Sequence, residues 1–295
     1  MCSGSSRCPH QACSLGAQWR PITEFSGLSS VALSDTAHEL AIDCVLVASG
    51  KYHDIDFARL ELLKLLAEDQ NIRVRVFEDY ANLEAIRAAQ FLVSYTCDVV
   101  PDQQQQIALH KWVEQGGRWY ALHGTNSILS FLENGLVGSP NSAPQLMKTL
   151  GTQFIAHPPI GTYRVDVADA AHELVQGIEP FDVLEELYLM DQHAELHVLL
   201  DTEFEGEAAG FVRSTWQRAR HPVMYLRPLG KGAVLYLTLG HCRGHHDMRP
   251  LMAHWPDVQR CAWDLPVFTE LLRRGLSWAK GERPARSKRT KYKKK

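Results

Sequence analysis

Hydrophobic residues in the first half of the chain alternate between strand-like and helix-like spacing. Residues 42–49 form a continuous apolar, β-favouring run that ends at Gly50, a pattern typical of a strand buried on both faces. The apolar residues after Asp54 recur every three or four positions, which predicts a helix. Asp54 can cap this helix, because its side chain can accept a backbone N–H group. Residues 72–77 and 89–95 predict a second and a third strand.

The same alternation continues through a second helix and a fourth strand. Asp102 follows Pro101 and precedes apolar residues at helical spacing, which predicts a helix to about residue 115. The pair Gly116-Gly117 ends this helix, and residues 119–122 form the next strand. Because strands and helices alternate, we expect a parallel sheet with right-handed crossovers.

The pattern changes after residue 124. Residues 126–150 resemble an irregular insert with short helices, and residues 265–280 form a closing amphipathic helix. Further strands are predicted at 163–167, 184–190, 196–202, 222–227 and 233–239, the last two as a hairpin around residues 228–232. We therefore expect one α/β domain over residues 40–280 with a mixed sheet, parallel strands first and antiparallel additions later. A flexible leader (1–39) precedes it and a basic, disordered tail (281–295) follows it.

Charge separates the tail from the rest of the chain. Of the 31 Lys and Arg residues nine lie from Lys280 onward, with only one of the 34 Asp and Glu residues, so the end carries about +8 and the remainder about −11. An acidic body is a poor nucleic-acid binder, because phosphate contact needs clustered Lys and Arg. Contact with nucleic acid is therefore expected only through the tail, if at all.

Cysteine usage and hydropathy favour a reducing compartment. The chain has seven cysteines, an odd number with no C-x-x-C pair, which argues against a disulfide framework. No apolar run has the length of a signal peptide or of a membrane span. We expect a cytoplasmic protein without membrane contact.

Histidines follow several of the predicted strands. In open α/β sheets ligands bind beyond the carboxyl ends of the strands. His53 follows the first strand, His123 the fourth and His241 the last, while His157 precedes Pro158 further along the chain. The sequence therefore predicts a pocket rich in imidazole at this edge of the sheet.

Several familiar chemistries are disfavoured. The tight turn that would carry the cysteine of a glutamine amidotransferase holds His123. Cys97 follows a different strand, and the neighbouring Asp98 would oppose formation of its thiolate. The motifs G-x-S-x-G, G-x-G-x-x-G and G-x-x-x-x-G-K-[ST] are absent from the sequence. Imidazole and carboxylate groups remain, and they could bind a divalent ion such as zinc or transfer protons directly.

A set of short motifs occurs in a fixed order along residues 42–280. They are Gly50-x-x-His53-Asp54, Gly116-Gly117-x-x-x-x-Leu122-His123-Gly124, Phe154-x-x-His157-Pro158, Ala171-His172-Glu173-Leu174 with Glu185-Glu186-Leu187-Tyr188, and Gly230-Lys231-Gly232 with Leu239-Gly240-His241. In this order and spacing the chain resembles the ThuA-like, trehalose-utilisation family.

The resemblance implies a flavodoxin-like three-layer sandwich, similar to class I glutamine amidotransferases but without their cysteine. It also implies a link to disaccharide catabolism. The chain departs from the family pattern at Glu185, where aspartate is usual, at Ala233, where arginine is frequent, and at Met224-Tyr225, where an aromatic residue often stands directly after Pro-Val.

Our first hypothesis is an enzyme that acts on a disaccharide or keto-sugar derivative by hydrolysis, elimination or isomerisation. The reactive cluster, which would also hold a divalent metal, is predicted to comprise His53, His123, Glu186 and His241. Substrate hydroxyls would be oriented by Asp54, His157 and Tyr188.

The alternative hypothesis is a non-catalytic carbohydrate-binding or regulatory protein on the same scaffold. In either case the expected partner is a small carbohydrate, and a homo-oligomer is compatible with the sequence.

Overall fold

The computed structural model of the protein describes residues 41–281. The predicted leader and, apart from Gly281, the predicted basic tail lie outside the described residues. The domain boundaries at residues 40 and 280 therefore stay predictions.

One half of the main sheet is parallel and has the predicted strands. Strands β1 (Ile42–Gly50), β2 (Ile72–Phe77), β3 (Phe91–Cys97), β4 (Arg118–Leu122) and β13 (Gly232–Leu237) lie in the order β2-β1-β3-β4-β13, with every neighbouring pair parallel. This is the strand order of flavodoxin-like sheets, in which the direction of winding reverses between β1 and β3. The predicted parallel half is confirmed.

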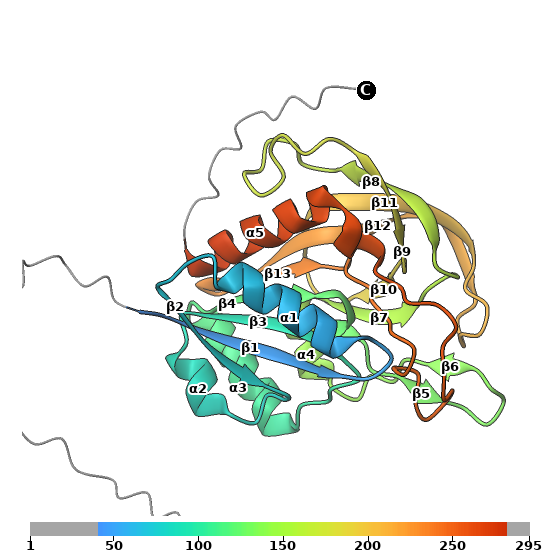
Figure 1. Cartoon of the computed structure of the whole chain (residues 1–295), viewed down its shortest axis with the longest axis horizontal. Helices are drawn as coiled ribbons and strands as arrows, with labels where there is room; N and C mark the ends of the chain where they lie inside the picture. Colours follow the sequence, from blue (N-terminus) through green and yellow to red (C-terminus); the bar gives the residue numbers. More distant parts are fainter. Residues whose placement is uncertain (1–40, 282–295) are drawn as a thin grey trace, which may run out of the picture. The chain divides into compact units, whose positions relative to one another are not determined.

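Helices cover both faces of these strands (Figure 1). Helices α1 (Ile55–Leu66) and α5 (Pro266–Lys280) pack on one face and share a hydrophobic core with residues such as Leu46 and Leu235. Helices α2 (Leu83–Ala88), α3 (Gln103–Glu114) and α4 (Pro144–Leu150) pack on the other face. The predicted caps hold, because the Asp54 side chain accepts the Phe57 N–H and the Asp102 side chain accepts the Gln105 N–H.

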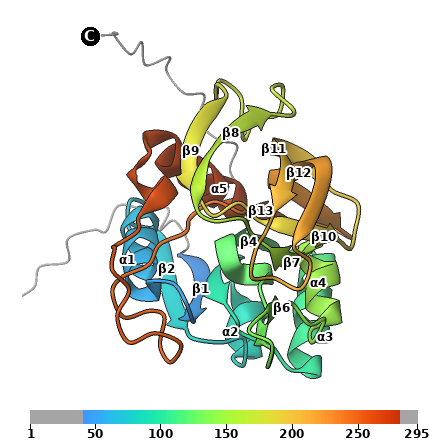
Figure 2. The ribbon, with the colours of Figure 1, turned by 90° about the vertical axis from the view of Figure 1, so that its right-hand side faces the viewer.

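The other half of the sheet is antiparallel. Strands β12 (Thr215–Leu229), β11 (His197–Glu207), β8 (Gly161–Val167) and β9 (Phe181–Glu185) continue from β13, giving a nine-stranded mixed sheet. Figure 2 shows the β11–β12 hairpin extending beside β8 and β9. The smaller elements are β5 (Ser130–Phe131) paired with β6 (Val137–Gly138), β7 (Thr152–Ala156) paired with β10 (Leu189–Gln192), and the 3₁₀ turns η1 (His123–Asn126) and η2 (Cys261–Asp264).

The predicted strand over residues 184–190 is wrong. Strand β9 ends at Glu185 and β10 begins at Leu189, so residues 186–188 leave the sheet. The Glu185 carboxylate accepts the N–H groups of Glu186, Gly240, His241 and Ala262. These bonds hold the end of β9 against two other loops, and the chain turns there toward the region beyond β4 and β13.

Within residues 41–281, no helix has both the length and the apolar character needed to cross a membrane.

Candidate metal centre

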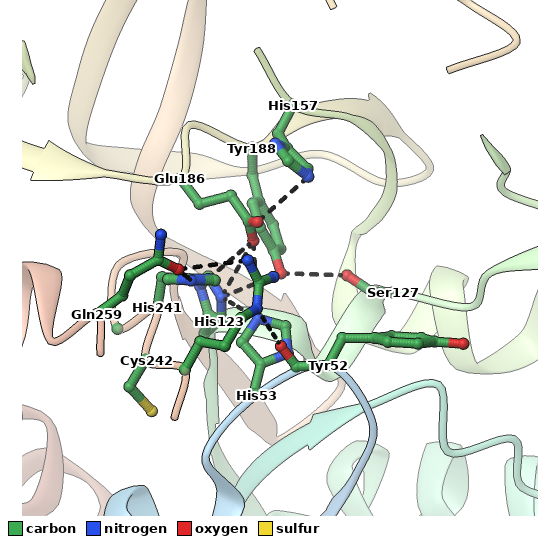
Figure 3. Close-up of polar contacts among 12 residues, drawn as sticks. Tyr52, His53, His123, Ser127, His157, Glu186, Tyr188, His241, Cys242 and Gln259 are labelled. Carbon is green, nitrogen blue, oxygen red and sulfur yellow. Dashed lines mark hydrogen bonds and ion pairs between the residues drawn. The ribbon is translucent and has the colours of Figure 1, made fainter. Parts of the chain in front are cut away.

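Four side chains from distant parts of the chain converge beyond the strand ends. His53 follows β1, His123 follows β4, Glu186 follows β9 and His241 lies beyond β13, and one ligand atom from each lies within 4.8 Å of all the others (Figure 3). All four residues are at most 6% exposed. The predicted cluster is thus assembled by the fold.

The outer ring nitrogen of each histidine faces an oxygen acceptor. His53 Nδ1 lies 3.1 Å from the Lys51 carbonyl, His123 Nδ1 lies 2.7 Å from the Thr238 carbonyl, and His241 Nε2 lies 2.9 Å from Gln259 Oε1. A carbonyl oxygen cannot donate, so each outer nitrogen carries the proton. In the neutral imidazoles the inner nitrogens then present lone pairs to the centre of the cluster, which is how metal-binding histidines are oriented in proteins.

The inner atoms have separations that suit a small divalent ion. His53 Nε2 lies 2.9 Å from His123 Nε2, and Glu186 Oε2 lies 3.4 Å from His123 Nε2, 3.4 Å from His241 Nδ1 and 3.7 Å from His53 Nε2. Zinc with ligands at about 2.0–2.1 Å separates tetrahedral ligand atoms by about 3.3 Å. His241 Nδ1 is fully buried without a hydrogen-bond partner, and facing lone pairs on His53 and His123 repel unless a cation or proton separates them. These residues therefore fit a divalent metal.

Burial and charge keep His53 and Glu186 in the protonation states that a metal needs. Burial lowers the pKa of His53 to about 3, so its imidazole is neutral near pH 7. Burial alone would raise the pKa of Glu186, but His157 and His241 hold it well below the usual value, and Glu186 is ionised. For His241 burial is outweighed by the Glu186 carboxylate, which raises the pKa of that imidazole when no metal is bound.

The turn after β4 aims His123 at the cluster. His123 has φ of 44°, a left-handed conformation that is uncommon for a residue with a side chain. A Cβ on the next residue, Gly124, would lie 2.6 Å from the Thr96 carbonyl oxygen and 2.9 Å from Cys97 Cβ, so only glycine fits there. This is the predicted tight strand-to-helix turn, and it carries an imidazole.

Two of the predicted substrate-binding residues lie against the cluster and one does not. The Tyr188 hydroxyl lies 3.3 Å from His123 Nε2, and His157 Nε2 lies 3.2 Å from Glu186 Oε1. The His157 side chain is 27% exposed and connects the buried cluster with solvent. Asp54 instead caps α1 and pairs with Arg260 at 3.0 Å.

The sequence pattern does not identify Glu185 and Gln259 as site residues. Glu185 holds the backbone of His241, and Gln259 fixes its ring. Glu185 stands directly before the predicted ligand Glu186 in the same motif, and nothing in the local pattern distinguishes a carboxylate that positions other residues from one that binds a metal. Gln259 lies in an irregular loop without periodicity, so no sequence signal identified it.

Solved structures with the same fold include a ThuA-like protein from Parabacteroides merdae, with a TM-score of 0.58 and 16% identity, covering 84% of this chain and 93% of that one. A ThuA-like protein from Bacteroides uniformis has a TM-score of 0.56 and 15% identity, covering 83% of this chain and 96% of the other. At these identities the likeness concerns the fold, which is the expected flavodoxin-like, glutamine amidotransferase-like one. No curated protein matches the sequence.

The sequence model of one family, ThuA (trehalose utilisation), matches residues 44–256, well over half of the chain and including every residue of the cluster. This protein belongs to the ThuA family.

Proposed function

We propose that the protein is an enzyme of carbohydrate metabolism that acts on a disaccharide or keto-sugar derivative through the His/Glu pocket with a divalent metal such as zinc. Membership of the trehalose-utilisation family supports a role in carbohydrate utilisation. The observation that carries the proposal is the orientation of the three histidines, whose outer nitrogens face oxygen acceptors while their inner nitrogens converge with Glu186.

His53, His123, His241 and Glu186 would hold the ion. A bound divalent metal would polarise a substrate carbonyl or hydroxyl oxygen and stabilise negative charge on it.

Two neighbouring groups would handle protons and hydroxyls. His157 reaches solvent and contacts Glu186 Oε1, whereas His123 lies nearest to Glu186 Oε2. His157 can therefore exchange protons between water and a bound sugar. Burial holds the pKa of Tyr188 well above its usual value, which keeps the phenol protonated as a hydrogen-bond donor. Hydrolysis, elimination and isomerisation beside a keto group all use a polarised oxygen and a proton carrier in this arrangement.

The test combines metal content with turnover. The purified full-length protein should hold about one divalent ion per chain by elemental analysis, and His123→Ala should weaken metal binding by more than about 100-fold, the upper range for losing an outer-shell partner alone. Trehalose and 3-keto-disaccharides would be offered to both proteins with and without added zinc, with product detected by chromatography. We expect turnover by wild type only.

His110→Ala serves as the matched control, because His110 lies on α3 and bonds Thr149 rather than the cluster. It should keep wild-type metal content and turnover. Equal residual activity in His123→Ala and wild type would contradict the proposed site. Tight sugar binding by wild type with no product after long incubation would favour the non-catalytic alternative.

A further inference from the structure

A buried arginine adjoins the cluster. Arg243 is 8% exposed and lies two residues after His241. Its Nε donates to the Tyr52 carbonyl at 3.0 Å, and its Nη1 donates at 3.3 Å to Gln259 Oε1, the same atom that accepts from His241. The guanidinium carbon lies 4.8 Å from the centre of the Trp255 ring. These contacts fix the cation beside the residues that carry His53 and His241.

Arg243 has no acidic partner. Among residues 41–281, no Asp or Glu oxygen lies within 4.0 Å of its side-chain nitrogens. Buried charges in proteins are normally paired, because a lone desolvated charge is costly. The neighbouring Arg260 shows the usual arrangement, since it pairs with Asp54 at 3.0 Å. The charge of Arg243 therefore requires another explanation.

One edge of the guanidinium is free to receive a ligand. The hydrogen bonds of Arg243 to the described residues use Nε and Nη1, and Nη2 is not among the fully buried atoms that lack a partner. Nη2 therefore keeps both of its donors and access to solvent. A guanidinium presents such donors in a planar fork that matches carboxylate and phosphate oxygens.

We propose that Arg243 is the anion-binding residue of this site and that the substrate is a sugar derivative carrying a carboxylate or phosphate group. The inference rests on the proposed function, whose substrate class it narrows. A divalent ion would balance the Glu185 and Glu186 carboxylates, and the Arg243 cation would leave the pocket with one positive charge in excess. An anionic sugar would neutralise this excess and pair the buried arginine, whereas a neutral sugar would leave it unpaired.

The test compares hexoses that differ in charge. Binding of D-glucuronate, D-glucose 6-phosphate and D-glucose to the full chain with its co-purified metal would be measured by calorimetry. We expect at least one anionic sugar to bind roughly tenfold or more tightly than glucose, since hydrogen bonds to charged groups are the stronger ones. The tighter of the two identifies carboxylate or phosphate as the preferred group.

Substitutions separate anion binding from a structural role. In Arg243→Gln the ratio of anionic-sugar affinity to glucose affinity should fall to about one, and Arg243→Lys should retain part of the preference. Arg118→Gln is the matched control, because Arg118 also contacts a tryptophan ring and a backbone carbonyl, both of Trp278, away from the cluster. It should behave as wild type. If Arg243→Gln does not fold, anionic and neutral sugars are compared on Arg243→Lys and on wild type at several salt concentrations.

The outcomes distinguish this inference from the proposed function. Equal binding of charged and neutral hexoses by wild type, or an equal loss of both in Arg243→Gln, would overturn the role of Arg243 and leave the sugar function standing. If no hexose binds, the sugar function is judged by the assay with trehalose and 3-keto-disaccharides, and inorganic phosphate becomes the probe of the anion site. Phosphate should then raise the unfolding temperature of wild type, raise that of Arg243→Lys by less, and leave that of Arg243→Gln unchanged. Equal shifts in all three proteins would overturn the anion site.

Discussion

Single side chains in this protein are fixed by contacts that local sequence does not reveal. His53 and His123 offer Nε2 to the centre of the cluster, whereas His241 offers Nδ1. The difference follows from their outer partners, because two backbone carbonyls hold the Nδ1 atoms of His53 and His123 while Gln259 holds Nε2 of His241. Each neutral ring is thereby restricted to one tautomer, which directs its lone pair toward the centre of the cluster.

Gly124 is a test of this fixation at the scale of one residue. Gly124→Ala would place a Cβ against the Thr96 carbonyl and Cys97, which must move the turn that carries His123. We expect a loss of about 1–3 kcal/mol in unfolding free energy, the usual range for overpacking, together with weaker metal binding. Urea unfolding and metal titration measure the two effects.

The matched control for Gly124→Ala is Gly161→Ala. A Cβ at Gly161 meets its nearest neighbour, the Pro159 carbonyl oxygen, at 3.5 Å, an ordinary contact. This variant should keep wild-type stability within about 0.5 kcal/mol. Equal stability of the two variants would mean that the crowding at Gly124 does not matter.

At the scale of elements, Glu185 joins segments that are far apart in sequence. Its buried carboxylate at the end of β9 accepts N–H groups from Gly240 and His241 beyond β13 and from Ala262 in η2. The connection keeps Glu186 and His241, which come from different parts of the sheet, in one place. Burial raises the pKa of Glu185, an effect that the His123 and His241 side chains and, to a lesser extent, the N–H groups of Glu186 and Ala262 partly offset.

Glu185→Ala should therefore loosen both loops. We expect a loss of about 3 kcal/mol in unfolding free energy, because buried N–H groups lose their acceptor, with a parallel fall in metal affinity. Chemical denaturation and elemental analysis check the two expectations. Glu207→Ala, at an exposed position whose carboxylate contacts Thr215, should change stability by no more than about 0.5 kcal/mol. A Glu185→Ala protein as stable as the Glu207→Ala protein would refute the joining role.

At the scale of the whole molecule, the buried histidines link stability to pH. His53 titrates with a pKa of about 3 in the metal-free folded protein and near 6.5 when unfolded. Between these values the unfolded chain binds the extra proton, so stability falls as pH falls. The raised pKa of His241 has the opposite sign, but that contribution is lost as pH rises above about 6.5 and hardly changes below it.

The metal-free wild type should therefore lose about 2 kcal/mol more stability between pH 7 and pH 5 than His53→Asn does, because the variant lacks the group that must stay neutral. Urea unfolding in the presence of a chelator at both pH values measures the difference. Parallel pH profiles for the two proteins would show that His53 is not held neutral by the fold.

Much of the architecture follows from the sequence alone. The alternation of apolar runs and capped helical segments determined the parallel strands and helices α1 and α3, because these patterns depend on residues close together in the chain. The rule that ligands bind beyond the carboxyl ends of parallel strands then placed His53, His123 and His241 at one edge. Glu186, His157 and Tyr188 belong to the later part of the chain, and all three lie in or against the cluster.

Only the tertiary structure decided how these residues act together. The path of residues 186–188 depends on Glu185 bonding to loops more than 50 positions away, so the local strand-like pattern there was misleading. The choice of ring nitrogen at each histidine, the bonds of Gln259 and the unpaired charge of Arg243 likewise come from contacts between separate elements. Such contacts leave no periodic trace in the sequence, since each depends on packing that exists only once the chain has folded.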